Sequence, residues 1–531
     1  MFTKHKIRRL GERLRDPEWR RYGYLLLAGK FLGVALLLTA VYYITSLLGS
    51  NVTAADAPPP VLKGNDIVNP LNTVWTLVAA FLVFGMQPGF TMLEAGFCRS
   101  RETVNVLMEC VVDTCLCGLL FYAWGFAFMF GAGTPFFGTE FFFLQGAPAT
   151  YGTTGVAFLA FWIFQYAFAD TCSTITSGAM IGRTGFVGDL IYSVGVSGFI
   201  YPIFGHWAWG PDGFLATMGS AGNFLPGLGM SFHDFAGSTV VHSIGGWVAL
   251  AGAIVLGPRL GRKFKRDGGG PMLPHDLTVA TVGGFILWFG WYGFNPGSTL
   301  SAMDFEGIGR IATNTTLAAC AAGLAAMFYA FPKTKTWDVS FTVNGFLAGL
   351  VAITCPCYWV SPTGAIILGA IAGVIVVVAV DVLEWLRIDD PIGAVPVHGI
   401  CGIWGTLSLG LFASGQFNST GPLGPDNASP LTGLFYGGGF QVLAAQAIGS
   451  AAIVTATFVT TLVMMYAINA FGILRVSEEG ELMGLDIHEH GVPAYPEYTL
   501  VPAATPQGTS SFNQSAFGSH SSPVLKQSAV K

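Results

Sequence analysis

The chain has 531 residues, of which 52% are hydrophobic and only 10% charged, and its mean hydropathy is +0.58. Ordinary soluble domains carry about 25% charged residues, so the composition excludes that class and indicates a polytopic membrane protein. The net charge of -5 gives no sign of a nucleic-acid partner.

The first 57 residues form a separate N-terminal segment. Eight Lys and Arg residues precede an apolar run from Tyr24 to Leu48, and Ala55-Asp56-Ala57 follows. This order is typical of a signal peptide. The run is long for one, so an uncleaved N-terminal anchor is the alternative. In both cases we expect the Pro-rich residues 58–70 to lie outside the cytoplasm.

The rest of the chain predicts an all-α membrane domain over residues 58–474. A helix needs about 20 apolar residues to cross about 30 Å of hydrocarbon, and only helices satisfy their own backbone there. Eleven stretches reach that length: 71–96, 104–130, 154–182, 186–209, 235–257, 277–298, 310–332, 340–359, 362–386, 391–414 and 437–471.

The charges in the connecting loops predict the orientation of these helices. With the mature N-terminus outside, the inner loops hold twelve Lys and Arg residues and the outer segments hold two, Lys63 and Arg310. Cytoplasmic loops collect such residues, so we expect an N-out, C-in topology. The tail 475–531 is then cytoplasmic, and its Ser-rich part beyond about residue 506 is expected to be disordered.

Two predicted helices share an unusual pattern of polar residues. Asp234 precedes His242 by eight residues in the fifth helix, and Asp390 precedes His398 by eight in the tenth. Five plus five helices in opposite orientation, followed by one C-terminal helix, would form an inverted repeat with the substrate path between its halves.

A histidine within the hydrocarbon region is costly and usually faces a bundle interior or a cavity. Each of the two could instead be a structural residue bonded to a neighbouring helix. If the rings of His242 and His398 meet, one nitrogen can donate while the other accepts, giving a dyad that burial keeps uncharged.

Nine cysteines and the acids suggest no catalytic centre. Most cysteines lie in apolar runs, where they pack as small hydrophobes, although a disulfide or metal role stays open for Cys355 and Cys357. No nucleophile arrangement, paired carboxylates or metal-ligand spacing stands out, so we expect neither an enzyme nor a bound cofactor or metal.

Longer motifs resemble a known family. The stretch Asp234-Phe-Ala-Gly-Ser-Thr-Val-Val-His242 resembles the D-F-A-G-G-T-V-V-H signature of the ammonium transporter family (Amt/Mep/Rh), on its Amt branch. Further matches are Gly290 to Ser298, Asp389-Asp-Pro391 with Val397-His398-Gly-Ile-Cys-Gly, and Leu474 to Glu479 with Gly484 to Gly491. The resemblance covers about residues 70–496.

This resemblance implies roles for the candidate residues. His242 and His398 would be twin pore histidines, and Trp209 and Ser298, with Phe168, would recruit ammonium through cation-π contact and a hydroxyl acceptor. Trp209 could instead be an interfacial belt residue. Phe294 and Phe168 would gate the pore. Cys172 stands where other members carry a second gate phenylalanine, which puts the double aromatic gate in doubt.

The membrane acids have mainly structural interpretations. Asp234 and Asp390 stand at helix starts, where a carboxylate caps free N–H groups. Asp170 could strengthen cation recruitment, although a hydrogen bond between helices is the alternative. Glu94, Glu109 and Asp113 receive no role from the sequence.

The predicted function is transport of ammonium nitrogen across a plasma or inner membrane, with methylammonium as an analogue. The rivals are an Rh-type channel for neutral ammonia or carbon dioxide and an ammonium sensor that acts through a cytoplasmic partner. The resemblance also implies a homotrimer and a PII-type signal protein docking at the cytoplasmic face.

Overall fold

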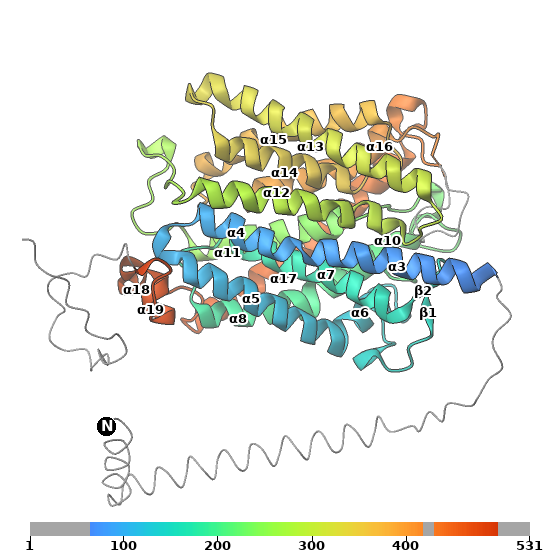
Figure 1. The fold of residues 1–531 in the computed structure, drawn as a ribbon, viewed down its shortest axis with the longest axis horizontal. Helices are drawn as coiled ribbons and strands as arrows, with labels where there is room; N and C mark the ends of the chain where they lie inside the picture. Colours follow the sequence, from blue (N-terminus) through green and yellow to red (C-terminus); the bar gives the residue numbers. More distant parts are fainter. Residues whose placement is uncertain (1–63, 418–429, 497–531) are drawn as a thin grey trace, which may run out of the picture. The chain divides into compact units, whose positions relative to one another are not determined.

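The computed structural model describes residues 64–417 and 430–496, which are mostly helical (Figure 1). The predicted leader 1–57 and the end beyond residue 506 lie outside the described residues, so the predictions made for them stay predictions. A short antiparallel pair, β1 (Thr150–Tyr151) with β2 (Val156–Ala157), lies in the loop before α7 (Phe158–Gly178).

Helices occupy all eleven predicted ranges. The first five ranges hold α3 (Gly64–Phe84) with α4 (Met86–Phe97), α5 (Thr103–Leu120) with η2 (Phe121–Gly125) and α6 (Phe126–Phe130), α7, α8 (Phe186–Gly195) with η4 (Val196–Ile200) and α9 (Tyr201–Trp209), and η6 (Ser238–Ser243) with α11 (Ile244–Leu256). The other six hold α12 (Leu277–Phe294) with η8 (Pro296–Thr299), α13 (Phe305–Thr334), α14 (Val339–Thr354), α15 (Pro362–Leu386), η9 (Val395–Ile400) with α16 (Cys401–Phe412), and α17 (Gln441–Ala470).

Nine helical runs within the described residues are long and apolar enough to cross a membrane. The two other predicted spans are α14, which has only 16 residues, and α7, whose 21 residues include Gln165 and Asp170. A multi-pass helical membrane protein is therefore supported, whereas the count of eleven spans and their orientation stay predictions.

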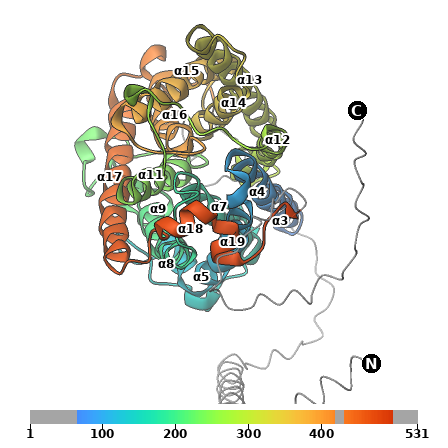
Figure 2. The ribbon, with the colours of Figure 1, turned by 90° about the vertical axis from the view of Figure 1, so that its left-hand side faces the viewer.

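Helices far apart in the sequence pack side by side. In Figures 1 and 2, α12 lies along α4, and α13 packs against both α14 and α15. At one of the closest crossings, Gly246 of α11 meets the backbone of Gly399 in η9, and a Cβ on Gly246 would lie only 2.5 Å from Cα of Gly399. This crossing lies directly beside both histidines, since each glycine follows its histidine by at most four residues.

Four segments, η2, η4, η6 and η9, are π-helical. Single π-turns are rare and often mark functional sites, because they widen the helix and change the direction in which side chains point. His242 lies in η6 and His398 lies in η9. The apolar pattern of the sequence predicts helices at both places but not this local geometry.

The tail continues as two short helices, α18 (Glu478–Met483) and α19 (Leu485–His490), at the end of the bundle where α5 and α8 begin (Figures 1 and 2). Arg475 donates to the carbonyls of Leu256 and Pro258, and Asp486 accepts from the backbone N–H of Asn105. These bonds tie the tail to helices from two parts of the chain.

Candidate transport pore

A buried aspartate starts the helix that carries the first histidine. Gly237 adopts a positive φ of 110°, which turns the chain so that the next N–H groups face the carboxylate of Asp234. One oxygen of Asp234 accepts from Gly237 and Ser238, and the other accepts from Thr239 and Val240, at 2.8 to 3.1 Å. These are the N–H groups that a helix start leaves without partners.

Asp390 repeats this arrangement ahead of η9. It accepts from the N–H groups of Gly393, Ala394 and Val395 at 2.8 to 3.1 Å. The fourth bond has no counterpart because Pro396 stands six residues after Asp390, where Val240 stands after Asp234, and proline has no N–H. The two Asp-to-His segments therefore share backbone geometry as well as spacing.

The structure brings the two histidines together. Nδ1 of His242 lies 3.2 Å from Nδ1 of His398, so one of these nitrogens donates and the other accepts. The ring centroids are 5.3 Å apart and the ring planes differ by 26°. His242 is fully buried and His398 is 6% exposed. Nε2 of His242 is bonded to no residue that the structure describes, so it remains available to a small polar solute.

Aromatic rings cover the pair on the side of His242. Trp291 and Phe294 stack on its imidazole at 5.1 and 5.3 Å, and Phe168 stacks on Phe294 with centroids 4.0 Å apart. Phe168 and Phe294 come from α7 and α12, so the double ring joins the two halves of the predicted repeat. It forms an apolar layer directly next to the buried histidine.

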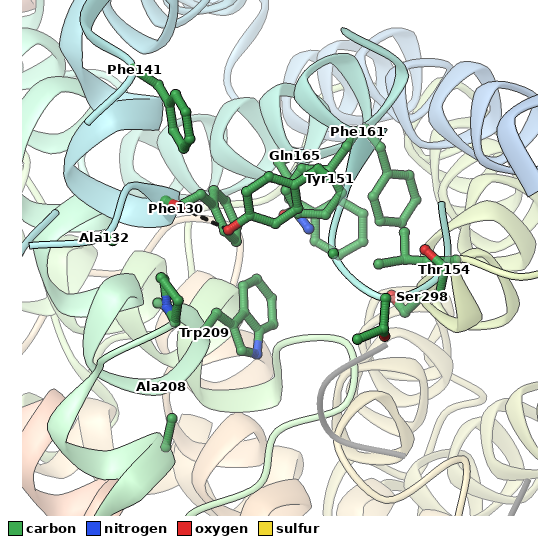
Figure 3. Close-up of a pocket in the computed structure, with 18 of the residues that line it drawn as sticks. Phe130, Ala132, Phe141, Tyr151, Thr154, Phe161, Gln165, Ala208, Trp209 and Ser298 are labelled. Carbon is green, nitrogen blue, oxygen red and sulfur yellow. Dashed lines mark hydrogen bonds between the residues drawn. The ribbon is translucent and has the colours of Figure 1, made fainter. Parts of the chain in front are cut away.

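Beyond this layer lies a cavity of about 500 Å³ (Figure 3). Trp209 and Ser298 lie on two sides of it, and Phe164, Gln165 and Phe168 also line it. The indole N–H of Trp209 donates to the carbonyl of Asp234 at 2.8 Å, which fixes the ring beside the cap. The hydroxyl of Ser298 donates to Phe294 at 2.8 Å, which leaves its oxygen able to accept from a ligand.

The three predicted gate residues lie at two levels of the bundle. The stacked partner of Phe294 is Phe168 itself, and Cys172 is buried one turn deeper in α7. Phe164, which the sequence analysis did not single out, packs on Phe168 at 4.6 Å and reaches the cavity. Its position four residues before Phe168 was the available signal, because residues at that spacing share a helix face.

Buried ion pairs close the opposite end of the bundle. Asp389 accepts from Nε and Nη2 of Arg259 at 2.9 and 3.0 Å, and Arg183 donates to the carbonyl of Asp389 at 2.7 Å. Burial opposes ionisation of Asp389, but the hydrogen bonds and charge of Arg259 hold the pKa of this carboxyl well below its usual range. Burial lowers the pKa of Arg183 to about 10, so it remains charged near neutral pH.

The cysteines form no bond with each other. All nine lie in the described residues and are free, including the buried pair Cys355 and Cys357. Across residues 64–417 and 430–496, no three His, Cys, Asp or Glu side chains are grouped as metal ligands. The chemistry of this region therefore rests on the histidines, the aromatic rings and the cavity polar groups.

Comparison with known proteins places the chain in a family. The model of the Ammonium Transporter Family matches residues 74–495. The chain belongs to this family. Ammonium transporter Amt2 of Archaeoglobus fulgidus is 43% identical over 470 residues, which cover 86% of this chain and 96% of the relative. Ammonium transporter 1 member 3 of Solanum lycopersicum is 37% identical, over 81% of this chain and 94% of the relative.

Solved structures of ammonium transporter relatives share the fold. One described as a sensor Amt protein has 36% identity and a TM-score of 0.70, over 80% of this chain and 99% of the other. Candida albicans Mep2 has 27% identity and the same TM-score, over 83% and 94%. The resemblance noted in the sequence is confirmed, and with it a multi-pass membrane setting and a transport protein rather than an enzyme.

Proposed function

We propose that this chain moves ammonium nitrogen by recruiting NH4+ in the cavity, removing a proton near the phenylalanine pair, and passing NH3 along a path lined by His242 and His398. The observation that carries the proposal is the 3.2 Å contact between the two imidazoles, directly beneath the stacked rings. A chance pair of structural histidines would not require the same aspartate cap on both segments.

The cavity fits the recruiting step. Trp209 offers an aromatic face and Ser298 an acceptor oxygen, and together they suit a cation that still keeps part of its water. The cap of Asp234 holds Trp209 in place through its carbonyl. Asp234 thus acts as structural support, and Asp390 does the same for η9.

Selectivity for ammonium over potassium depends on the proton that ammonium can lose and potassium lacks. Ammonium and potassium have the same charge and similar size, so a pore for bare cations separates them poorly. Moving an unpaired ion into an apolar, water-excluding layer costs many kcal/mol, whereas neutral ammonia avoids that cost. Phe168 and Phe294 supply the layer. An extra proton on either imidazole would create a positive charge in a buried site with no compensating partner, so the pair remains neutral and offers ammonia one donor or acceptor.

The test is a double substitution. His242→Ala with His398→Ala is expected to lower methylammonium uptake into proteoliposomes and to weaken its preference over potassium. The single variants show whether one ring suffices. Undiminished, selective uptake by the double variant would refute the role of the pair.

A neutral Rh-type gas channel is the first rival. A channel for uncharged gas has little use for a cation site, and the cavity retains Trp209 and Ser298. Charge movement after an ammonium pulse separates the two functions, because neutral conduction of ammonia moves none.

An ammonium sensor is the second candidate, and the likeness to a sensor Amt protein favours keeping it. In that case the pore would report ammonium through a separate protein at the cytoplasmic face. A sensor that does not transport would bind methylammonium in detergent yet fail to accumulate it in vesicles.

The remaining proposals concern the membrane setting. We propose eleven spans with the cavity outside and the Asp389 ion pairs in the cytoplasm, a homotrimer, a plasma or inner membrane location, and a PII-type trimer as a partner. Accessibility of a cysteine introduced at Lys335 and at Ser220 to a membrane-impermeant label tests the orientation. Labelling at Ser220 alone from outside is expected.

A further inference from the structure

The cavity wall carries one charged side chain, which the proposed path of ammonium does not yet use. Among the described residues that line the cavity, Glu140 is the one Asp, Glu, Lys or Arg. Its side chain is exposed, and within the described part of the chain its carboxylate forms no hydrogen bond or ion pair. A fixed negative charge at the wall of a cavity raises the local concentration of cations there.

The loop that carries Glu140 is folded tightly against the end of α6. Thr139 donates its N–H to the carbonyl of Ala132 at 2.9 Å, directly before Glu140. Gly131 has no Cβ, and a Cβ at that position would lie 2.6 Å from the carbonyl oxygen of Glu140. Ala132 also lines the cavity. The backbone of the loop therefore holds Glu140 at the cavity wall.

The other charges of the proposed outer side do not neutralise Glu140. Among the described residues of the outer segments, Arg310 is the one Lys or Arg. Asp212 accepts from the N–H of Gly133 at 2.8 Å and lies 3.2 Å from Nε2 of His206, so the protein itself engages this second acid. The carboxylate of Glu140 has no such partner and is left to act on ions that approach the cavity.

A polar side chain of α7 in the cavity wall also lacks a partner. Gln165 lines the cavity and is only 7% exposed, yet its amide oxygen has no hydrogen bond to any described residue. Figure 3 shows Gln165 at the same cavity as Trp209 and Ser298. Leaving a buried amide unbonded is costly, so a ligand or a water molecule should complete it. The carboxamide can turn to present its oxygen to an N–H donor.

We propose that Glu140 and Gln165 assist Trp209 and Ser298 in collecting ammonium: the carboxylate of Glu140 attracts the cation from solution, and the carboxamide of Gln165 replaces part of its water shell. The inference rests on the proposed function and assigns further residues to its first step. No bond is made or broken at this step. The two side chains therefore set the affinity for ammonium and leave the later loss of the proton unchanged.

The two contributions differ in their dependence on salt. A unit charge about 4 to 7 Å from a cation in a water-like dielectric changes the affinity about three- to sixfold. Salt screens this effect, because the Debye length falls from about 30 Å at about 0.01 M to about 3 Å at about 1 M. A hydrogen bond changes the affinity about two- to tenfold, and its short range makes it insensitive to salt.

The experiment measures the KM for methylammonium in proteoliposomes of phosphatidylcholine, which has no net charge, with N-methylglucamine chloride as the added salt. Glu140→Gln should raise the KM about three- to sixfold at about 0.01 M salt and leave it unchanged at about 1 M. Gln165→Leu should raise the KM about two- to tenfold at both concentrations. Glu306→Gln removes an exposed acid at the start of α13, outside the cavity, and is the matched control with the wild-type KM.

Each outcome decides a different question. If the wild-type protein takes up no methylammonium, the proposed function fails. If it does, and Glu140→Gln keeps the wild-type KM at low salt, the proposed function stands and the role of Glu140 is overturned. A rise that persists at about 1 M salt, or an equal rise in Glu306→Gln, also overturns it. An unchanged KM in Gln165→Leu overturns the role of Gln165. Should Glu140→Gln not fold, Glu140→Ser takes its place with the same expected values.

Discussion

The crossing of Gly246 and Gly399 gives the sharpest prediction about the histidine pair. An alanine Cβ at position 246 would lie 2.5 Å from Cα of Gly399 and closer still to its nitrogen. Ordinary contacts begin at 3.4 Å, so η9 would have to move by about 1 Å. Such a shift would carry the Nδ1 to Nδ1 distance of 3.2 Å out of hydrogen-bond range.

Gly246→Ala should therefore impair transport more than stability. Misplacement by about 1 Å can cost up to about 100-fold in rate, whereas overpacking costs about 1 to 3 kcal/mol in stability. The assays are initial rates of methylammonium uptake in proteoliposomes and thermal unfolding in detergent. We expect uptake to fall at least about tenfold. The variant protein should still be recovered in folded form.

Gly323→Ala is the matched control, because it adds the same methyl group within α13. Its Cβ would lie 3.3 Å from Cβ of Phe346, so a small adjustment suffices. Both substitutions gain about 1 kcal/mol of helix propensity, which leaves packing at the crossing as the difference. Wild-type uptake by Gly246→Ala would show that the close approach of η9 to α11 does not set the geometry of the pore.

Two further predictions concern the cavity and the ion pairs. Trp209→Leu removes the aromatic face and should raise the KM for methylammonium about tenfold, with a smaller change in the maximal rate. Trp209→Phe keeps an aromatic ring and should give an intermediate KM. Equal KM values for the wild type and Trp209→Leu would show that Trp209 is not part of the recruiting site. Asp389→Asn leaves Arg259 without its charged partner and should cost about 3 kcal/mol of stability, seen as a lower Tm. Because the pKa of Asp389 is lowered in the folded state, its stabilisation is complete above the unfolded value of about 3.9 and is lost only as the pH falls through the lower folded value. The loss of Tm should thus be equal at about pH 6 and about pH 8, and a loss that differs between them would contradict this assignment.

Much of the fold was accessible from the sequence because lipid imposes a simple rule on helix length. All eleven predicted ranges contain helix, including α7, whose Gln165 and Asp170 lower its hydropathy. The π-turns were not predictable, since they are rare and the apolar pattern of these segments is that of an ordinary α-helix. The close approach of Gly246 to Gly399 was not predictable either, because neither segment's sequence shows which helix it packs against.

The site was predicted residue by residue only where a motif existed. The eight-residue spacing from Asp234 to His242, repeated from Asp390 to His398, indicated that the rings could meet. Cys172 was considered because other members of the family carry a second gate phenylalanine there, whereas the ring that stacks on Phe294 is that of Phe168. Phe164 carried the correct spacing but no distinguishing chemistry among 43 phenylalanines.

The acids show a different limit. Glu109 and Asp113 form a visible stripe on α5, but a single stripe does not reveal what it faces. Only the packing of α5 against α8 shows that this stripe and Asp189 are buried in the same part of the bundle.

The central claim is that only a cation able to give up a proton crosses the layer between the cavity and the histidines. The direct measurement compares uptake of radiolabelled methylammonium and rubidium by the same wild-type proteoliposomes, since rubidium resembles ammonium in charge and size but carries no proton. The account predicts methylammonium uptake with rubidium at the level of empty vesicles. Rubidium uptake at a comparable rate would contradict it.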